Sequence, residues 1–167
     1  DIVLTNPGLG VIIEAIRSSR RIFQRMNSYA IYRITETIRI MFFVVLAMIV
    51  FNLYPITTVM IILLALLNDL PILTIAYDNT RLNPKPVRWN MHRVLTVAAT
   101  LGLSGLAASF LLFWYADMVL GLPRDQIQTL IFLKLLVAGH LTIYVTRNQS
   151  WFWTKPYPSM RLFLTTE

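Results

Sequence analysis

Residues 63–79 read LLALLNDLPILTIAYDN, and this apolar run has a carboxylate, Asp69, near its middle. Asn68 precedes Asp69, and Pro71 follows it by two positions. The apolar residues predict a membrane-spanning helix, and an ionised aspartate in hydrocarbon costs at least about 2.5 to 3.5 kcal/mol. We therefore expect Asp69 to face a protein interior or a water-filled cavity, or to carry a proton.

The whole chain has the composition of a membrane protein. Of its 167 residues, 56% are hydrophobic and only 14% are charged, and the mean hydropathy is +0.61. Soluble domains of this length rarely have so little charge. The basic residues that give the net charge of +7 lie between the apolar runs, so we expect no nucleic-acid partner. The chain has no cysteine, only two histidines and no metal-spaced acidic set, so we expect no metal site.

Four stretches are long and apolar enough to cross a hydrocarbon core of about 30 Å as helices. They cover approximately residues 29–51, 56–77, 94–116 and 127–146. Lysine and arginine gather before the first stretch, between the second and third, and after the fourth, which predicts that both termini are cytoplasmic. The sequence therefore predicts an all-α, multi-pass membrane protein with four transmembrane helices in a lipid bilayer. A soluble bundle would need polar faces that these stretches lack.

The first 28 residues differ from the rest. DIVLT at 1–5 has the pattern of a strand, residues 6–8 that of a turn, and residues 10–26 that of a helix with four arginines. We expect residues 1–28 to be the end of a cytoplasmic α/β domain followed by a basic stalk helix. Residues 29–167 would then form a transmembrane domain with a cytoplasmic tail, and the chain would be a piece of a longer protein.

The polar residues near Asp69 predict a proton-binding site. Pro71 lacks the N–H that would bond to the carbonyl of Leu67, so we expect a break in the helix beside Asp69. Counted from the same side at 1.5 Å per residue, Arg39 lies roughly 15 Å into the first span and Asp69 roughly 12 Å into the second. This similar depth predicts that Arg39 is a neighbour of Asp69 that favours its ionised form. The alternative is a static ion pair that only aligns the helices.

Other polar residues in the spans can contribute to the same site. Glu36 and Arg39 are spaced i, i+3 and can pair, so we expect them to act together as a counter-charge or gate. We expect Asn68 to help Asp69 bind the proton. Lys134 and His140 lie six residues apart in the fourth span and are candidate accessory groups that line a polar route or bond to a neighbouring helix.

Four strings carry a more specific signal: DIVLTNPGL at 1–9, SSRRIFQRMNSYAIYRITETIRI at 18–40, LLALLNDLPILTIAYDN at 63–79 and IYVTRNQSWFW at 143–153. They resemble the C-terminal part of P-type ATPases of the plasma-membrane proton-pump branch. The resemblance implies that DIVLT closes the phosphorylation domain and that the four spans are helices five to eight of the pump. It also implies that Asp69 is the proton carrier and that Arg39 promotes release and blocks return.

The complete pump implied by this resemblance is a translocase of the plasma membrane that exports protons and hydrolyses ATP, with Mg²⁺ as cofactor. The remaining domains of the same pump would be its partners. The chain lacks an Asp-Lys-Thr-Gly phosphorylation motif, so we expect no ATP hydrolysis and no cofactor in this part alone.

Two other functions stay open at this point. One is a P-type pump for another cation such as Ca²⁺, which takes about six to eight oxygen ligands. The spans offer chiefly Asp69, Asn68 and Glu36, which fits a proton better. The second is a small non-enzymatic four-helix membrane protein.

Overall fold

The structure is a computed structural model that describes residues 9–80, 89–147 and 155–166. Over these residues it contains helices and no strands, and four of the helices are long and apolar enough to cross a membrane. The predicted fold class, an all-α membrane protein with four spans, is confirmed. The strand expected at residues 1–5 lies outside the described residues.

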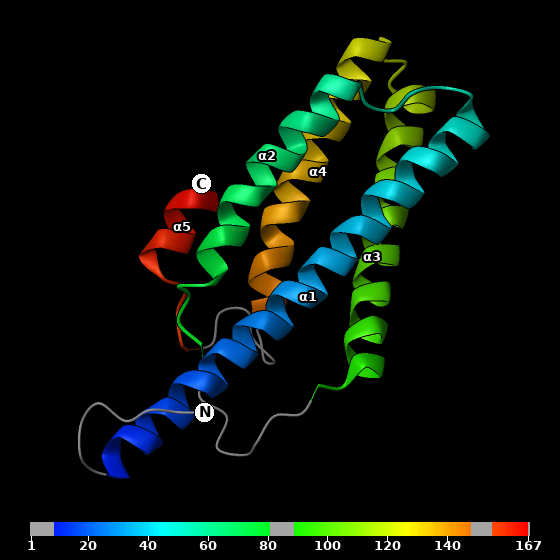
Figure 1. The fold of residues 1–167 in the computed structure, drawn as a ribbon. Helices are drawn as coiled ribbons and strands as arrows, with labels where there is room; N and C mark the ends of the chain where they lie inside the picture. The colour runs from blue at the N-terminus through cyan, green and yellow to red at the C-terminus, as the bar shows by residue number, and fades with distance from the viewer. Residues whose placement is uncertain (1–8, 81–88, 148–154, 167) are drawn as a thin grey trace.

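Helix α1 (Leu9–Phe51) joins the predicted basic helix and the first span without a break. At 1.5 Å per residue its 43 residues extend about 65 Å, roughly twice the thickness of a hydrocarbon core. Its N-terminal part accordingly projects beyond the other helices (Figure 1). The helix ends at a tight turn in which Asn52 has a φ of 51°, a left-handed conformation that asparagine tolerates better than most residues.

The other spans begin at side chains that cap them. Helix α2 (Thr58–Ile75) has Thr57 as its N-cap, whose hydroxyl accepts from the N–H of Met60, and α3 (Met91–Trp114) has Asn90, which accepts from the N–H of Arg93. A π-helical turn, η1 (Tyr115–Val119), continues α3, and α4 (Arg124–Arg147) is the fourth span. The sequence did not predict the short helix α5 (Met160–Thr166).

Helix α1 is the centre of the arrangement. It packs mainly against α3 and α4, whereas α2 packs against α4 and α5 and touches α1 little. Figure 1 shows α2 and α4 side by side, with α5 against the outer side of α2. The main core lies between α1, α3 and α4, where Phe43 and Phe113 are buried among leucine and isoleucine side chains. In the most apolar part of each span only 22–28% of the residues are buried, so most apolar side chains face outward, as they do in a lipid-exposed bundle.

Candidate ion-binding site in the membrane

A buried polar cluster joins α1 to α2. The Glu36 carboxylate accepts from the Arg39 guanidinium through Oε2 and from Asn68 Nδ2 through Oε1, the latter at 3.1 Å. The side chains of Arg39 and Glu36 are only 2% and 6% exposed, and Asn68 is buried. The expected pairing of Glu36 with Arg39 is therefore present, and the amide of Asn68 belongs to this pair rather than to Asp69.

Arg39 is held in place by the neighbouring helices. Its Nη1 donates to the hydroxyl of Thr142 at 3.2 Å, and its Nη2 lies 3.4 Å from the carbonyl oxygen of Leu135, both on α4. On α3, Gly105 leaves room for the arginine, because a Cβ there would lie 2.8 Å from Arg39 Cδ. These contacts fix the guanidinium in the core between three helices.

Asp69 does not face Arg39, and the expected contact between these two residues is wrong. Its Oδ1 lies 3.4 Å from Nη1 of Arg33, and the Arg33 and Asp69 side chains are 52% and 54% exposed. The similar depth of Arg39 and Asp69 says nothing about the direction in which each points around its helix. Because neighbouring residues on a helix are rotated by about 100°, Asn68 faces the core and Asp69 faces away from it.

Pro71 does not break the second span, so the expected helix break is wrong. Helix α2 continues through it to Ile75, and the proline is buried. Pro71 removes only one backbone hydrogen bond, and its own carbonyl accepts from the hydroxyl of Thr74 at 2.7 Å. Membrane helices tolerate proline when packing and side-chain hydroxyls support the backbone around it.

Lys134 and His140 lie on α4 with separate partners. Lys134 Nζ donates to the carbonyl of Gly105 at 2.9 Å and to the hydroxyl of Ser109, which joins α4 to α3. His140 Nδ1 is 2.9 Å from the carbonyl oxygen of Thr166 on α5. In the described residues both groups therefore bond between helices, which was one of the two roles considered for them.

A second buried ion pair lies where α2 and α4 end, at the predicted cytoplasmic side. Arg147 Nε donates to Asp78 Oδ2 at 2.8 Å, and both side chains are at most 3% exposed. The other carboxylate oxygen accepts from the N–H of Ser159 at 2.9 Å, and Arg25 of α1 donates to the Asp78 carbonyl at 2.7 and 3.0 Å. The pair thus ties α1, α2, α4 and the segment before α5 together. Counting depth along the spans places both residues on the same side of the membrane, but depth alone does not pair them.

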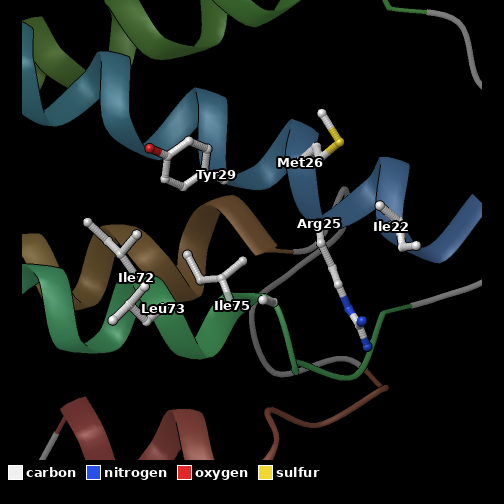
Figure 2. Close-up of a pocket in the computed structure, with 8 residues that line it drawn as sticks. Ile22, Arg25, Met26, Tyr29, Ile72, Leu73 and Ile75 are labelled. Carbon is white, nitrogen blue, oxygen red and sulfur yellow. The ribbon is translucent and has the colours of Figure 1, made fainter. Parts of the chain in front are cut away.

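An apolar groove of about 460 Å³ separates α1 from α2 on the same side of the bundle. Figure 2 shows Ile22, Met26 and Tyr29 of α1 opposite Ile72 and Leu73 of α2. The guanidinium of Arg25 extends away from these apolar groups, toward the end of α2 (Figure 2).

The ion pair formed by Arg33 and Asp69 lies next to the groove along both helices. Arg33 lies one helical turn from Tyr29, and Asp69 lies one turn from Leu73, so the groove and the pair share one face. We call this face, made of the groove residues with Arg33 and Asp69, the open face.

Two relatives match almost the whole chain. It is 56% identical over 163 residues to a Methanocaldococcus jannaschii protein named as a cation-transporting ATPase, which covers 98% of the chain and 20% of that relative. It is 36% identical over 158 residues to a protein of Dictyostelium discoideum named as a plasma membrane ATPase, which covers 89% of the chain and 15% of that relative. The chain is homologous to one segment of these ATPases.

The resemblance to P-type ATPases found in the sequence is thereby confirmed for this segment. The segment spans about a fifth of the length of the first relative and less of the second. No family model matches it.

Proposed function

We propose that this ATPase segment forms the proton-binding membrane part of a P-type pump that exports protons across the plasma membrane, with Asp69 as the group that binds the transported proton. One relative is named for cation transport and the other for the plasma membrane, which supports a transport function at the cell surface. Under this proposal both termini are cytoplasmic, as the distribution of basic residues predicts.

The half-exposed carboxylate of Asp69, placed inside a span and in contact with Arg33, is the observation that carries the proposal. A carboxyl that binds and releases protons needs a route by which the proton arrives, and the Asp69 side chain lies on the open face rather than packed among the four spans. The contact with Arg33 is long, at 3.4 Å, whereas the Glu36 carboxylate accepts from both Arg39 and Asn68. A proton on Asp69 would therefore replace one long contact, while the arginine stays close enough to favour proton release.

A proton also fits this set of charges better than a metal cation does. Both carboxylates of the site are already paired with guanidinium groups, Asp69 with Arg33 and Glu36 with Arg39. A metal cation would have to displace these positive charges and collect about six to eight oxygen ligands if it were Ca²⁺. A proton needs one carboxylate oxygen.

We assign different roles to the two arginines. Arg33 is the counter-charge that stabilises ionised Asp69, because it is the arginine in contact with it. Arg39 anchors Glu36 and α4, and it acts on Asp69 only through the position of α1 and α2.

The remaining domains of the same pump would complete the site. An ion pair and an apolar groove side by side at membrane depth are a poor surface for lipid, because a charge facing hydrocarbon is costly. We propose that further transmembrane helices of the longer protein cover the open face and enclose Asp69. ATP and Mg²⁺ would act in the domains outside this segment, and the segment itself supplies the ion site.

The test is ATP-driven acidification of vesicles that contain the complete pump, followed with a pH-sensitive dye. Asp69→Asn should abolish acidification, since an amide cannot take up and release the proton. Asp125→Asn is the matched control, because Asp125 is exposed in the first turn of α4, and it should leave the rate unchanged. Acidification by Asp69→Asn at the wild-type rate would remove Asp69 from transport, and ATP-driven uptake of another cation without acidification would refute proton specificity.

A further inference from the structure

Glu36 is the most enclosed carboxylate of the site. Its side chain is 6% exposed, whereas that of Asp69 is 54% exposed. Its two oxygens have different partners, because Oε2 accepts from the permanently charged Arg39 and Oε1 accepts from the neutral amide of Asn68. A proton that arrives at Glu36 would therefore be placed on Oε1, since the guanidinium has no lone pair with which to accept it.

Asn68 has an acceptor that is not in use. Its Oδ1 is buried and makes no hydrogen bond within the described part of the chain. The amide lies against Gly139 of α4, where a Cβ would come within 2.8 Å of Oδ1 and 3.3 Å of Nδ2. Both ends of the amide fit there only because residue 139 has no side chain. A buried carbonyl oxygen without a partner is costly, which makes the unused acceptor informative.

The charged and titratable groups near Glu36 lie on two helices. Arg39, Arg33 and the buried phenol of Tyr32 lie on α1, and His140 and Lys134 lie on α4. From α2 the group in contact is the neutral amide of Asn68, followed in the chain by Asp69 on the other side of the helix. When Glu36 is neutral, Arg39 keeps its contacts with the hydroxyl of Thr142 and the carbonyl of Leu135. The guanidinium therefore retains acceptors in either state.

We propose that Glu36 is a second proton-binding carboxylate and that Asn68 is its switchable partner. In the ionised state Oε1 accepts from Nδ2, as the structure shows. A proton from a hydronium ion then forms an O–H bond on Oε1 and leaves water behind. The amide turns by about half a revolution, the Nδ2 contact breaks, and the new O–H donates to Oδ1. Each state then has one hydrogen bond between carboxyl and amide.

This inference deepens the proposed function, and it rests on that function for its purpose in transport. Because Asn68 and Asp69 are adjacent on α2, turning of the amide links proton binding at Glu36 to the helix that carries Asp69. The proton-binding property itself can be measured without ATP or transport, so the two proposals can fail separately.

The experiment is infrared difference spectroscopy of the complete pump reconstituted in lipid without ATP, titrated from alkaline to acid pH in H₂O and in D₂O. Wild-type protein should show a protonated-carboxyl C=O band that is lost in Glu36→Gln, shifts in D₂O and is retained in Glu14→Gln. Glu14 is the matched control, since it is an exposed glutamate on the same helix. A band that persists unchanged in Glu36→Gln, or the absence of any band that depends on Glu36, would overturn the inference.

A second variant keeps the test decisive if Glu36→Gln does not fold. Asn68→Ala retains the carboxyl and removes its acceptor, so the Glu36 band should remain and move to higher frequency. An unchanged frequency would show that the protonated carboxyl does not donate to Asn68 and would refute the switch. Asp69→Asn should leave the Glu36 band in place whether or not Asp69 carries the transported proton, which separates the two proposals.

Discussion

Helix α1 contains two Glu/Arg pairs with the same order and spacing and opposite burial, which allows a controlled measurement of the buried one. Glu36 and Arg39 are paired i, i+3 with side chains 6% and 2% exposed, whereas Glu14 and Arg17 are paired i, i+3 at 4.0 Å with side chains 63% and 59% exposed. The change is a double-mutant cycle at each pair, with glutamate replaced by leucine and arginine by methionine.

The expected magnitudes follow from burial. Arg39→Met leaves the Glu36 carboxylate buried without its cation, and removing one partner of a buried pair costs about 3 to 5 kcal/mol. Glu36→Leu leaves the buried Arg39 guanidinium without its anion and should cost a similar amount. The double variant removes both charges and leaves only the Asn68 amide without its hydrogen-bond partner, which costs about 1 to 3 kcal/mol of stability. The double variant should therefore be more stable than either single variant, with a coupling of several kcal/mol.

The exposed pair should behave differently. Glu14 and Arg17 remain solvated in every variant, and exposed helix pairs couple by about 0.3 to 0.5 kcal/mol. The measurement is the free energy of unfolding in lipid or detergent by steric trapping, carried out on all four members of each cycle. Equal coupling at the two pairs, or a double variant at 36 and 39 as unstable as the sum of its single variants, would refute the assignment of a buried and coupled pair.

Three further predictions concern single positions and the same unfolding measurement. Gly139→Val should destabilise by about 1 to 3 kcal/mol, because its Cβ would meet the Asn68 amide at 2.8 Å in a packed core. Arg147→Ala should cost about 3 to 5 kcal/mol, because it leaves the buried Asp78 carboxylate without its cation. Lys134→Met should cost about 1.5 to 3 kcal/mol, because it nearly keeps the side-chain volume but removes the charged hydrogen bonds to the Gly105 carbonyl and the Ser109 hydroxyl.

Each of these predictions has a control or a contradicting result. Gly10→Val is the control for position 139, since a Cβ at Gly10 meets nothing within 4 Å. Arg161→Ala is the control for Arg147, since Arg161 is exposed, lies over a tyrosine ring and should contribute about 0.5 to 1 kcal/mol. A loss below about 0.5 kcal/mol in Lys134→Met would show that these hydrogen bonds do not hold α4 to α3.

Hydrophobic length was enough to predict the spans. The predicted spans 56–77 and 94–116 correspond to α2 (Thr58–Ile75) and to α3 with its π-helical turn, and the basic helix does run directly into the first span. The short helix α5 was missed, because seven residues carry too little periodicity and α5 is fixed by packing on α2 and by hydrogen bonds with His140 and Tyr144 of α4. The sequence wrongly predicted a helix break at Pro71, because it does not show the packing that supports the helix there.

The sequence predicted which residues make up the candidate site, but not the direction in which each side chain points. Spacing along one helix correctly paired Glu36 with Arg39, because residues three apart on a helix are neighbours whatever surrounds them. Pairing between helices was wrong, since depth fixes only one coordinate and the rotation of each helix is set by its packing, of α1 on α3 and α4 and of α2 on α4 and α5. That rotation points Asn68 inward, where it donates to Glu36, and points Asp69 to the other side, where it accepts from Arg33.

The unbroken course of α1 has a mechanical consequence. Because no turn or proline interrupts the helix between its basic N-terminal part and residue 39, it behaves as a single stiff rod over that length. A translation or rotation of the end that lies beyond the bundle is therefore transmitted to Arg33 and Glu36, because no hinge in between absorbs it. One extra residue inserted near residue 26 would turn the two ends about 100° out of phase and would uncouple whatever is attached to the outer end from the carboxylates within.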